Sequence, residues 1–164
     1  MPQPQLEHHK FLKVLLLQNI QVLSTLTLIA YQDGGNSSYG TAIVGTVDSS
    51  NNSISFGTAV VFESADTREL AATFDSNSNK VVIAYQDTGN GSYGTAIVGT
   101  VDPSDNSISF GTAVVFESAS TYDISASFDS NSNKVVIAYS DNGNSNYGTA
   151  IVGTVDSSDN SISF

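Results

Sequence analysis

The chain contains no cysteine and no tryptophan, and only 5 of its 164 residues are lysine or arginine. Without cysteine, neither a disulfide framework nor a thiolate metal site is available. Sixteen acidic residues give a net charge of −11, which disfavours nucleic acid and anionic membrane surfaces as partners. Both histidines lie within residues 1–22, so the remaining chain lacks the usual general base. We expect no catalytic site, no nucleic-acid partner and no membrane insertion.

One stretch, Tyr-Gly-Thr-Ala-Ile-Val-Gly-Thr-Val-Asp, occurs three times and begins at Tyr39, Tyr93 and Tyr147. It belongs to a unit of 54 residues that repeats almost without change. A fixed period of this length indicates an array of structural repeats, each packed against its neighbours. We divide the chain into a non-repeat segment, 1–22, and about two and a half repeats, 23–65, 66–119 and 120–164.

Each repeat predicts four short antiparallel strands, which in the central copy are 70–74, 80–86, 93–101 and 107–116. Clusters of Asn, Asp, Gly and Ser separate them, as in successive hairpins. The second and third strands are apolar at consecutive positions, which indicates that both of their faces are covered. Stacking of similar sheets face to face would supply that cover.

This pattern resembles the general class of β-propeller repeats over residues 23–164. The resemblance rests on the strand count, the period and motifs such as FDSNSNKVVIAY, and it implies tandem four-stranded blades. No Trp-Asp dipeptide or other specific family motif accompanies it. A linear β-solenoid, or a string of small β-sandwiches, remains the alternative, because repetition alone does not demand ring closure. Exposed strand edges and a bare blade face predict association with other copies of the repeat or of the chain.

Residues 1–22 match nothing else in the chain and only superficially resemble a signal peptide, because polar residues interrupt their apolar core. Apolar residues at helical spacing predict an amphipathic helix, and disorder is the alternative. A reconstruction of the codons suggests that residues 1–28 are a frameshifted copy of the repeat. The nucleotide sequence of the gene tests that hypothesis.

The copies 39–92 and 93–146 differ at 12 of 54 positions, and ten of these lie within residues 66–73 and 86–92 or their equivalents. In an up-and-down meander both regions emerge at the same end of the sheet. Loops on a rigid scaffold commonly carry binding residues, although drift in exposed loops explains the same differences. The candidate ligand-binding residues are Arg68, Asp87, Asn90, Tyr93, Tyr122, Asp141, Asn144 and Tyr147.

The turn Asp-Ser-Asn-Ser-Asn occurs twice and places oxygen-bearing side chains at the first, third and fifth positions of a calcium loop. The glycine and the glutamate that complete such a loop are missing, and a tight hairpin favours the same residues. We therefore expect no cofactor, with calcium as the alternative. The residues concerned are Asp75, Asn77, Asn79, Asp129, Asn131 and Asn133.

These observations favour a non-enzymatic structural or adhesive module of an extracellular, cell-surface or virion tail or fibre protein. The second hypothesis is a multivalent carbohydrate-binding propeller that binds surface glycans through the tyrosines flanking the 86–92 turn, such as Tyr85 and Tyr93. The third is a fragment of a glycoside hydrolase with a carboxylate pair such as Asp66 and Glu69. Near-identical repeats disfavour it, because one carboxyl would need a distinctive environment to stay protonated.

Overall fold

A computed structural model describes residues 12–17 and 25–164, and this part of the chain is all-β and antiparallel. Two 3₁₀ turns, η1 (Thr88–Asn90) and η2 (Asn142–Asn144), lie in connections between consecutive strands. The prediction of an all-β fold is confirmed. The strands are β1 (Leu12–Leu17), β2 (Thr25–Asp33), β3 (Tyr39–Asp48), β4 (Ser53–Phe56), β5 (Val60–Asp75), β6 (Lys80–Asp87), β7 (Tyr93–Asp102), β8 (Ser107–Phe110), β9 (Val114–Asp129), β10 (Lys134–Asp141), β11 (Tyr147–Asp156) and β12 (Ser161–Ser163).

Turn chemistry fixes where the hairpins reverse. After β7, the Asp102 carboxylate accepts hydrogen bonds from the backbone nitrogen and the hydroxyl of Ser104, at 2.9 and 2.7 Å. Asn106 then takes a left-handed backbone conformation, with φ of 58°. Asparagine tolerates this conformation better than most residues, and the turns after β3 and β11 use equivalent residues. The repeated polar clusters therefore specify the turns.

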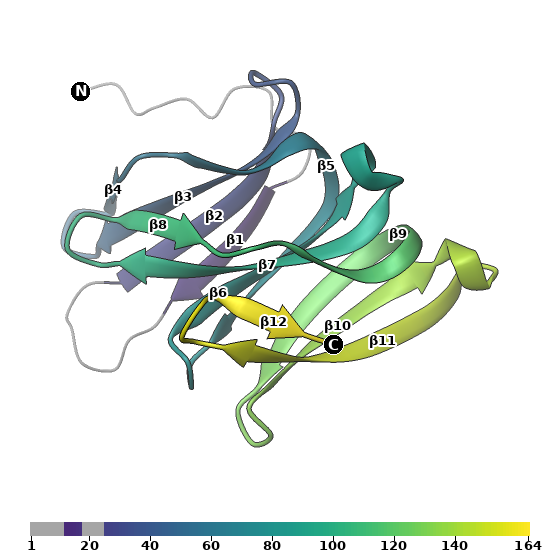
Figure 1. The fold of residues 1–164 in the computed structure, drawn as a ribbon. Coiled ribbons are helices and arrows are strands. Elements are labelled where there is room, and N and C mark those ends of the chain that lie inside the picture. The colour runs from purple at the N-terminus through teal and green to yellow at the C-terminus, as the bar shows by residue number, and fades with distance from the viewer. Residues whose placement is uncertain (1–11, 18–24) are drawn as a thin grey trace.

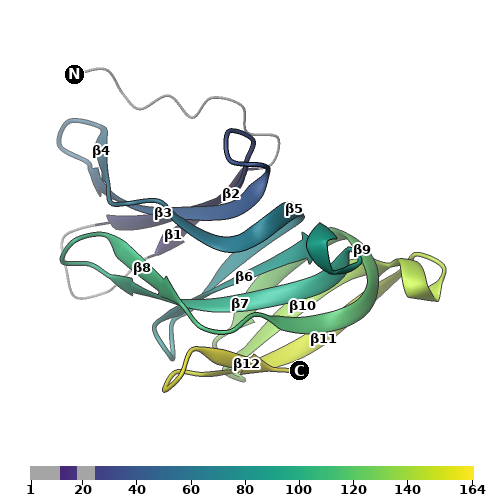
Figure 2. The same ribbon diagram turned by 45° about the horizontal axis from the view of Figure 1, so that its top comes forward.

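The strands pair in the order β1-β2-β3-β5-β6-β7-β9-β10-β11-β12, with β4 paired to β3 and β8 to β7. The sheet is open in the described part of the chain, because β1 and β12 end this path without pairing to each other. Figure 2 shows that the sheet folds into three stacked layers built around β2 and β3, β6 and β7, and β10 and β11. We call them the first, second and third layers.

The long strands β5 and β9 join one layer to the next, as Figure 1 shows. Val60 of β5 pairs with Ala42 of β3, whereas Thr67, further along the same strand, pairs with Asp87 of β6. A bulge follows Arg68, and β9 connects β7 to β10 in the same way. The predicted strand boundaries 70–74 and 107–116 are therefore wrong: residues 70–74 belong to the longer strand β5, and residues 107–116 are divided between β8 and β9. The short strand β8 is followed by one long strand, β9, because its first half pairs with β7 and its second half pairs with β10.

Two hydrophobic clusters lie between the layers. Leu28 and Val44 of the first layer pack with Ile83 and Tyr85 of the second. The opposite face of the second layer contributes Val82, Ala84, Ala96 and Val98, which pack with residues of β9 and β10 that include Ile124, Val135, Ile137 and Tyr139. Both faces of β6 and β7 are thus covered, as their consecutive apolar residues predict.

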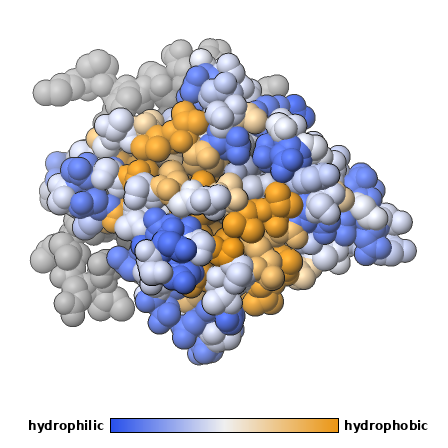
Figure 3. Space-filling model, in the orientation of Figure 1, coloured by the Kyte–Doolittle hydropathy of each residue, from blue (hydrophilic) through white to orange (hydrophobic). Residues whose placement is uncertain are grey.

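The outer face of the third layer differs from the equivalent face of the second. Val98 and Ala84 are fully buried, whereas Val152, the counterpart of Val98, is 54% exposed and Ala138, the counterpart of Ala84, is also exposed. In Figure 3, which views another side, apolar side chains gather over the first halves of β5 and β9, where Val61 and Val115 are exposed. Identical sequence thus lies in covered and uncovered environments within one chain.

Residues 12–17 form β1, although the sequence predicted a helix or disorder for this segment. Val14 pairs with Ile29 and Leu16 with Thr27, so β1 lies beside β2 as the second half of β5 lies beside β6. A short apolar run is compatible with a helix or a strand, and the edge of β2 supplies backbone partners for a strand. The other residues of segment 1–22 lie outside the described part of the chain.

Candidate functional site

Backbone pairing brings the variable segments to one end of the sheet. Arg68 pairs with Gln86, and Asp87 pairs both with Thr67 on one side and with Tyr93 on the other. The third layer repeats this arrangement around Asp141, and η1 and η2 lie at the same end (Figure 1). The candidate residues are therefore neighbours, with one cluster in each of the second and third layers.

Each cluster lies where a long strand, β5 or β9, passes from one layer to the next. The backbone nitrogen of Thr67 donates to Ser38 of the first layer at 3.1 Å, while Thr67 itself pairs with Asp87 of the second. The Thr88 hydroxyl, at the start of η1, donates to the Asp66 carbonyl at 2.7 Å. These bonds hold the η1 loop on the sheet, and in the second copy the backbone nitrogen of Thr121 donates to the Ser92 carbonyl at 3.3 Å.

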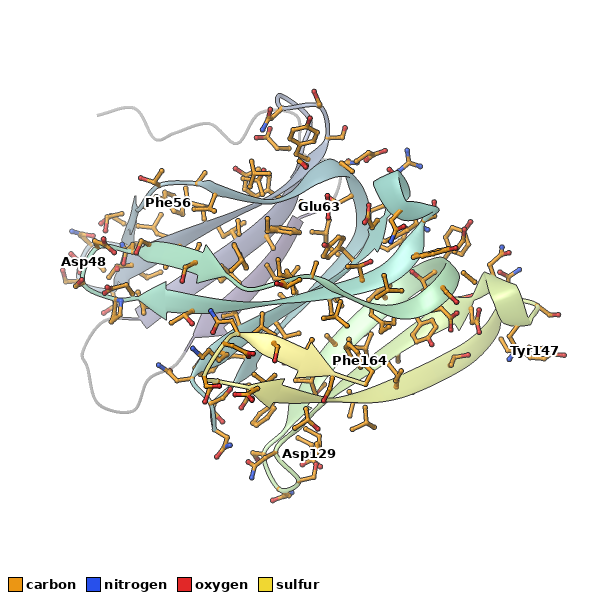
Figure 4. All side chains as sticks on the ribbon, in the orientation of Figure 1. Asp48, Phe56, Glu63, Asp129, Tyr147 and Phe164 are labelled. Atoms are coloured by element: carbon orange, nitrogen blue, oxygen red, sulfur yellow. The ribbon has the colours of Figure 1, made fainter. Side chains whose placement is uncertain are left out.

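Some of the candidate residues are exposed at this end. The Arg68 guanidinium donates to the Asp66 carboxylate, at 2.8 Å from Nη2 and 3.1 Å from Nε. Tyr122, its counterpart in the next repeat, is 41% exposed, and Tyr147 is 65% exposed. Figure 4 shows Tyr147 at the far right-hand end of the molecule. Asn90 and Asn144 are exposed in η1 and η2, whereas Tyr93 is half-buried. This surface combines aromatic rings with amides.

Asp87 and Asp141 are instead buried, with 8% of each residue exposed. In each, Oδ1 has no hydrogen-bond partner within the protein, and the same holds for the hydroxyls of Thr67 and Thr121 beside them. These four residues are two copies of one buried Thr-Asp pair, because Thr67 pairs with Asp87 and Thr121 with Asp141. The pair recurs at both junctions between layers.

Glu63 and Glu117 also lie at these junctions, and sequence reasoning did not select them. The Tyr85 hydroxyl donates to Glu63 Oε2 at 3.1 Å, and Tyr139 makes the same bond to Glu117. Tyr85 is fully buried, so its ring cannot contact a ligand. The recurring Phe-Glu-Ser, 22 residues before each tyrosine, was the available signal.

Burial and charge shift the proton affinities within this group. Burial, followed by the nearby Asp87 carboxylate, raises the pKa of Glu63 above 4.5. Burial and Glu63 raise the pKa of Tyr85 well above 10.0. Burial and the hydrogen bond to Glu117 raise the pKa of Tyr139 to about 12. Glu63, Tyr85 and Tyr139 therefore ionise at higher pH than they would in water.

The residues considered for calcium form a hairpin turn. Asp75 Oδ1 accepts from the backbone nitrogens of Asn77 and Ser78 at 2.9 and 3.1 Å, and Asn79 has a φ of 57°. The second copy repeats this turn from Asp129 through Asn131 to Asn133. Within residues 12–17 and 25–164, no three His, Cys, Asp or Glu side chains gather in a group that could hold a metal ion.

The carboxylates considered for glycoside hydrolysis each have other partners. Asp66 forms the ion pair with Arg68, and Glu69 Oε2 accepts from the backbone nitrogen of Asp123 in the next layer at 3.1 Å. Glu69 thereby links β5 to β9, at a position where its own φ is 51°. In this arrangement both groups make structural contacts.

No known protein family matches the chain, and neither does any curated protein or any solved structure. Within the described residues, no helix is long and apolar enough to cross a membrane.

Proposed function

We propose that the chain is a non-enzymatic structural or adhesive repeat module, and that its three layers are blades of a β-propeller-like array. One observation carries this proposal: Val98 is fully buried in the second layer, whereas its counterpart Val152 is 54% exposed in the third. A sheet face whose sequence is covered elsewhere in the same chain is suited to receive another layer. A linear stack of layers is the alternative architecture.

Two further features support a role in assembly. Each junction contains the same Tyr-Glu hydrogen bond and the same Phe-Tyr ring contact, with centroids 5.3 Å apart for Phe62–Tyr85 and 5.2 Å for Phe116–Tyr139. Because the same contacts recur at both junctions, the same interface can join any two successive copies of the repeat. The acidic composition, rich in Gly, Ser, Asn and Thr, favours an extracellular, cell-surface or virion location.

Light-scattering mass as a function of protein concentration tests the assembly role. The wild-type chain is expected to associate, and Val152→Lys is expected to reduce association because it places a charge on the uncovered face. Val61→Lys changes an equally apolar residue that is 43% exposed elsewhere, so it is the matched control. A chain that remains monomeric at every concentration, or a Val152→Lys variant that associates like wild type, would overturn the proposal.

A second candidate function is multivalent binding of carbohydrate at the end of the sheet. Exposed Tyr122 and Tyr147, with Asn144 in the adjacent η2, support it, because aromatic rings beside amides suit sugar binding. A glycan array with the wild-type chain tests it, and Tyr122→Ala and Tyr147→Ala should both weaken any saturable binding. Tyr85→Ala is unsuitable, since that ring belongs to the core. A blank array would reject this function and leave the assembly role in place.

A further inference from the structure

A phenylalanine lies directly on a glycine in each of the first two layers. A methyl group placed on Gly40 would lie 2.6 Å from Phe62 Cε2, and one placed on Gly94 would lie 2.4 Å from Phe116 Cε2. Distances this short leave no room for a side chain. Glycine at these positions therefore forms the seat for the aromatic ring, which then contacts the tyrosine of the next layer.

Backbone pairing brings each phenylalanine to its glycine. In the second layer Val114 and Val115 pair with Ala96 and Thr95, and Glu117 pairs with Gly94. The first layer has the same register between the first half of β5 and β3. The segment Val-Val-Phe-Glu thus adds antiparallel to the edge formed by Tyr-Gly-Thr-Ala in both layers.

The same edge of the third layer is unpaired among the residues that the structure describes. Residues 147–150 repeat Tyr-Gly-Thr-Ala, but within the described part of the chain no strand pairs with the outer edge of this half of β11. A methyl group placed on Gly148 would meet nothing within 4 Å. Gly148 and Tyr147 are both exposed, whereas Gly94 and Gly40 are buried.

We propose that this edge of β11 is a binding site for an extended peptide strand that carries Val-Val-Phe-Glu. The strand adds antiparallel, with its phenylalanine seated on Gly148 and its glutamate opposite Gly148. Backbone pairing supplies affinity and the seat for the ring supplies specificity, as in other cases of strand addition to a sheet edge. An unpaired edge with exposed amides and carbonyls is a ready template for such a partner.

The chemistry of the ligand follows from the two filled copies. The two valines pair with the threonine and the alanine of the edge, and the phenylalanine needs a neighbour without a side chain. The following glutamate accepts a hydrogen bond from a tyrosine of the next layer. No further layer covers an isolated peptide, so its affinity must come from backbone pairing and from the contact of its phenylalanine ring with Gly148. This inference deepens the assembly role and rests on it, but peptide binding and self-association are measured separately, so each can fail alone.

Fluorescence anisotropy with a labelled peptide of residues 111–121 tests the site on the full chain. Saturable binding is expected, together with protection from hydrogen–deuterium exchange at residues 147–150. A peptide with alanine in place of its phenylalanine is expected to bind at least about tenfold more weakly, which corresponds to ~1.4 kcal/mol. A scrambled peptide of the same composition controls for non-specific association.

Gly148→Val places a side chain in the seat and should weaken binding of the wild-type peptide by a similar factor. Gly35→Val, at another exposed glycine in the first layer, is the matched control and should leave binding unchanged. If Gly148→Val fails to fold, the affinity of the alanine peptide and the hydrogen–deuterium exchange at residues 147–150 still test the proposal. Absence of saturable binding, or binding that neither the alanine peptide nor Gly148→Val weakens, would overturn the proposal.

Discussion

The hydroxyl of Tyr85 lies 3.1 Å from Oε2 of Glu63 and joins the second layer of the sheet to the first. Tyr85 has no exposed surface, and Glu63 belongs to the half of β5 that pairs with β3. The bond therefore places an acidic group at a junction that also contains the buried Asp87. We therefore expect the stability of the junction to depend on pH.

The first prediction concerns the charge of Glu63. Because burial and Asp87 raise its pKa above 4.5, the folded chain binds the proton more tightly than the unfolded chain does. The free energy of unfolding should therefore fall as the pH rises from 4.5 through the folded pKa, and then level off. Glu63→Gln keeps an acceptor for Tyr85 and should remove this contribution. Urea denaturation of both proteins across that window measures the difference.

The expected signature is a stability difference that grows in favour of Glu63→Gln as the pH rises through the window. Glu117→Gln makes the same exchange at the equivalent tyrosine bond and shows whether the effect is common to both junctions. The pKa values of Asp48 and Asp102 are lowered by hydrogen bonds from serine, and they act at lower pH, where stability is lost as they protonate. A constant difference between wild type and Glu63→Gln would contradict the prediction.

The second prediction concerns Tyr139, whose pKa is raised from 10.0 to about 12 by burial and by the bond to Glu117. Its ionisation is disfavoured in the folded chain, so this residue should contribute a loss of stability as the pH rises above 10.0. In a titration followed by tyrosinate absorbance, Tyr139→Phe should remove a component near pH 12. A titration curve that keeps this component in Tyr139→Phe would assign it to another tyrosine.

The third prediction compares one substitution in two environments. Gly94→Ala should lower the free energy of unfolding by ~1–3 kcal/mol, because the methyl group would overlap Phe116 in a filled junction. Gly148→Ala should be neutral or stabilising by up to ~1 kcal/mol, since nothing lies within 4 Å and alanine restricts the unfolded chain. Equilibrium denaturation of both variants measures the contrast.

Equal effects of Gly94→Ala and Gly148→Ala would show that Phe116 does not depend on the seat. The two sites share the sequence Tyr-Gly-Thr-Ala, so local propensity is matched between them. Any contrast therefore reports on the tertiary environment alone.

Local pattern was sufficient to predict the strands around β6 and β7 and the turns between them. The apolar run of residues 81–85 needs cover on both sides, and the Asn-rich clusters need left-handed backbone conformations. The continuous course of β5 was not predictable in this way. Residues 66–69 are polar and resemble a loop, yet Thr67 is fully buried because it pairs with Asp87 while its backbone nitrogen bonds to Ser38.

The sequence was sufficient to predict the exposed residues of the candidate site, but not the buried groups beneath them. Sequence differences between repeats identified segments that the pairing of Arg68 with Gln86 brings together. One of these differences has a structural counterpart: Gln86 donates a hydrogen bond to the Thr121 carbonyl of the third layer. In the third layer itself, Ser140 stands at the position equivalent to Gln86. The burial of Asp87 and the Glu63 partner of Tyr85 depend on contacts between layers, which no local pattern encodes.

The fourth prediction concerns the buried hydroxyl of Thr67. This group is fully buried and has no hydrogen-bond partner within the protein, and an unpaired buried hydroxyl costs ~1–3 kcal/mol. Thr67→Val keeps the branched shape and removes the hydroxyl, so it should raise the free energy of unfolding by on the order of 1 kcal/mol. Thermal and urea denaturation measure the change.

Thr88→Val is the matched control for that substitution. The Thr88 hydroxyl donates to the Asp66 carbonyl at 2.7 Å, so its removal should lower the free energy of unfolding by ~0.5–1.5 kcal/mol. Opposite signs for the two threonines would show that hydrogen bonding, and not side-chain volume, decides their effects. A loss of stability in Thr67→Val would instead show that its hydroxyl is satisfied in solution, for which an ordered water shared with Asp87 is the available partner.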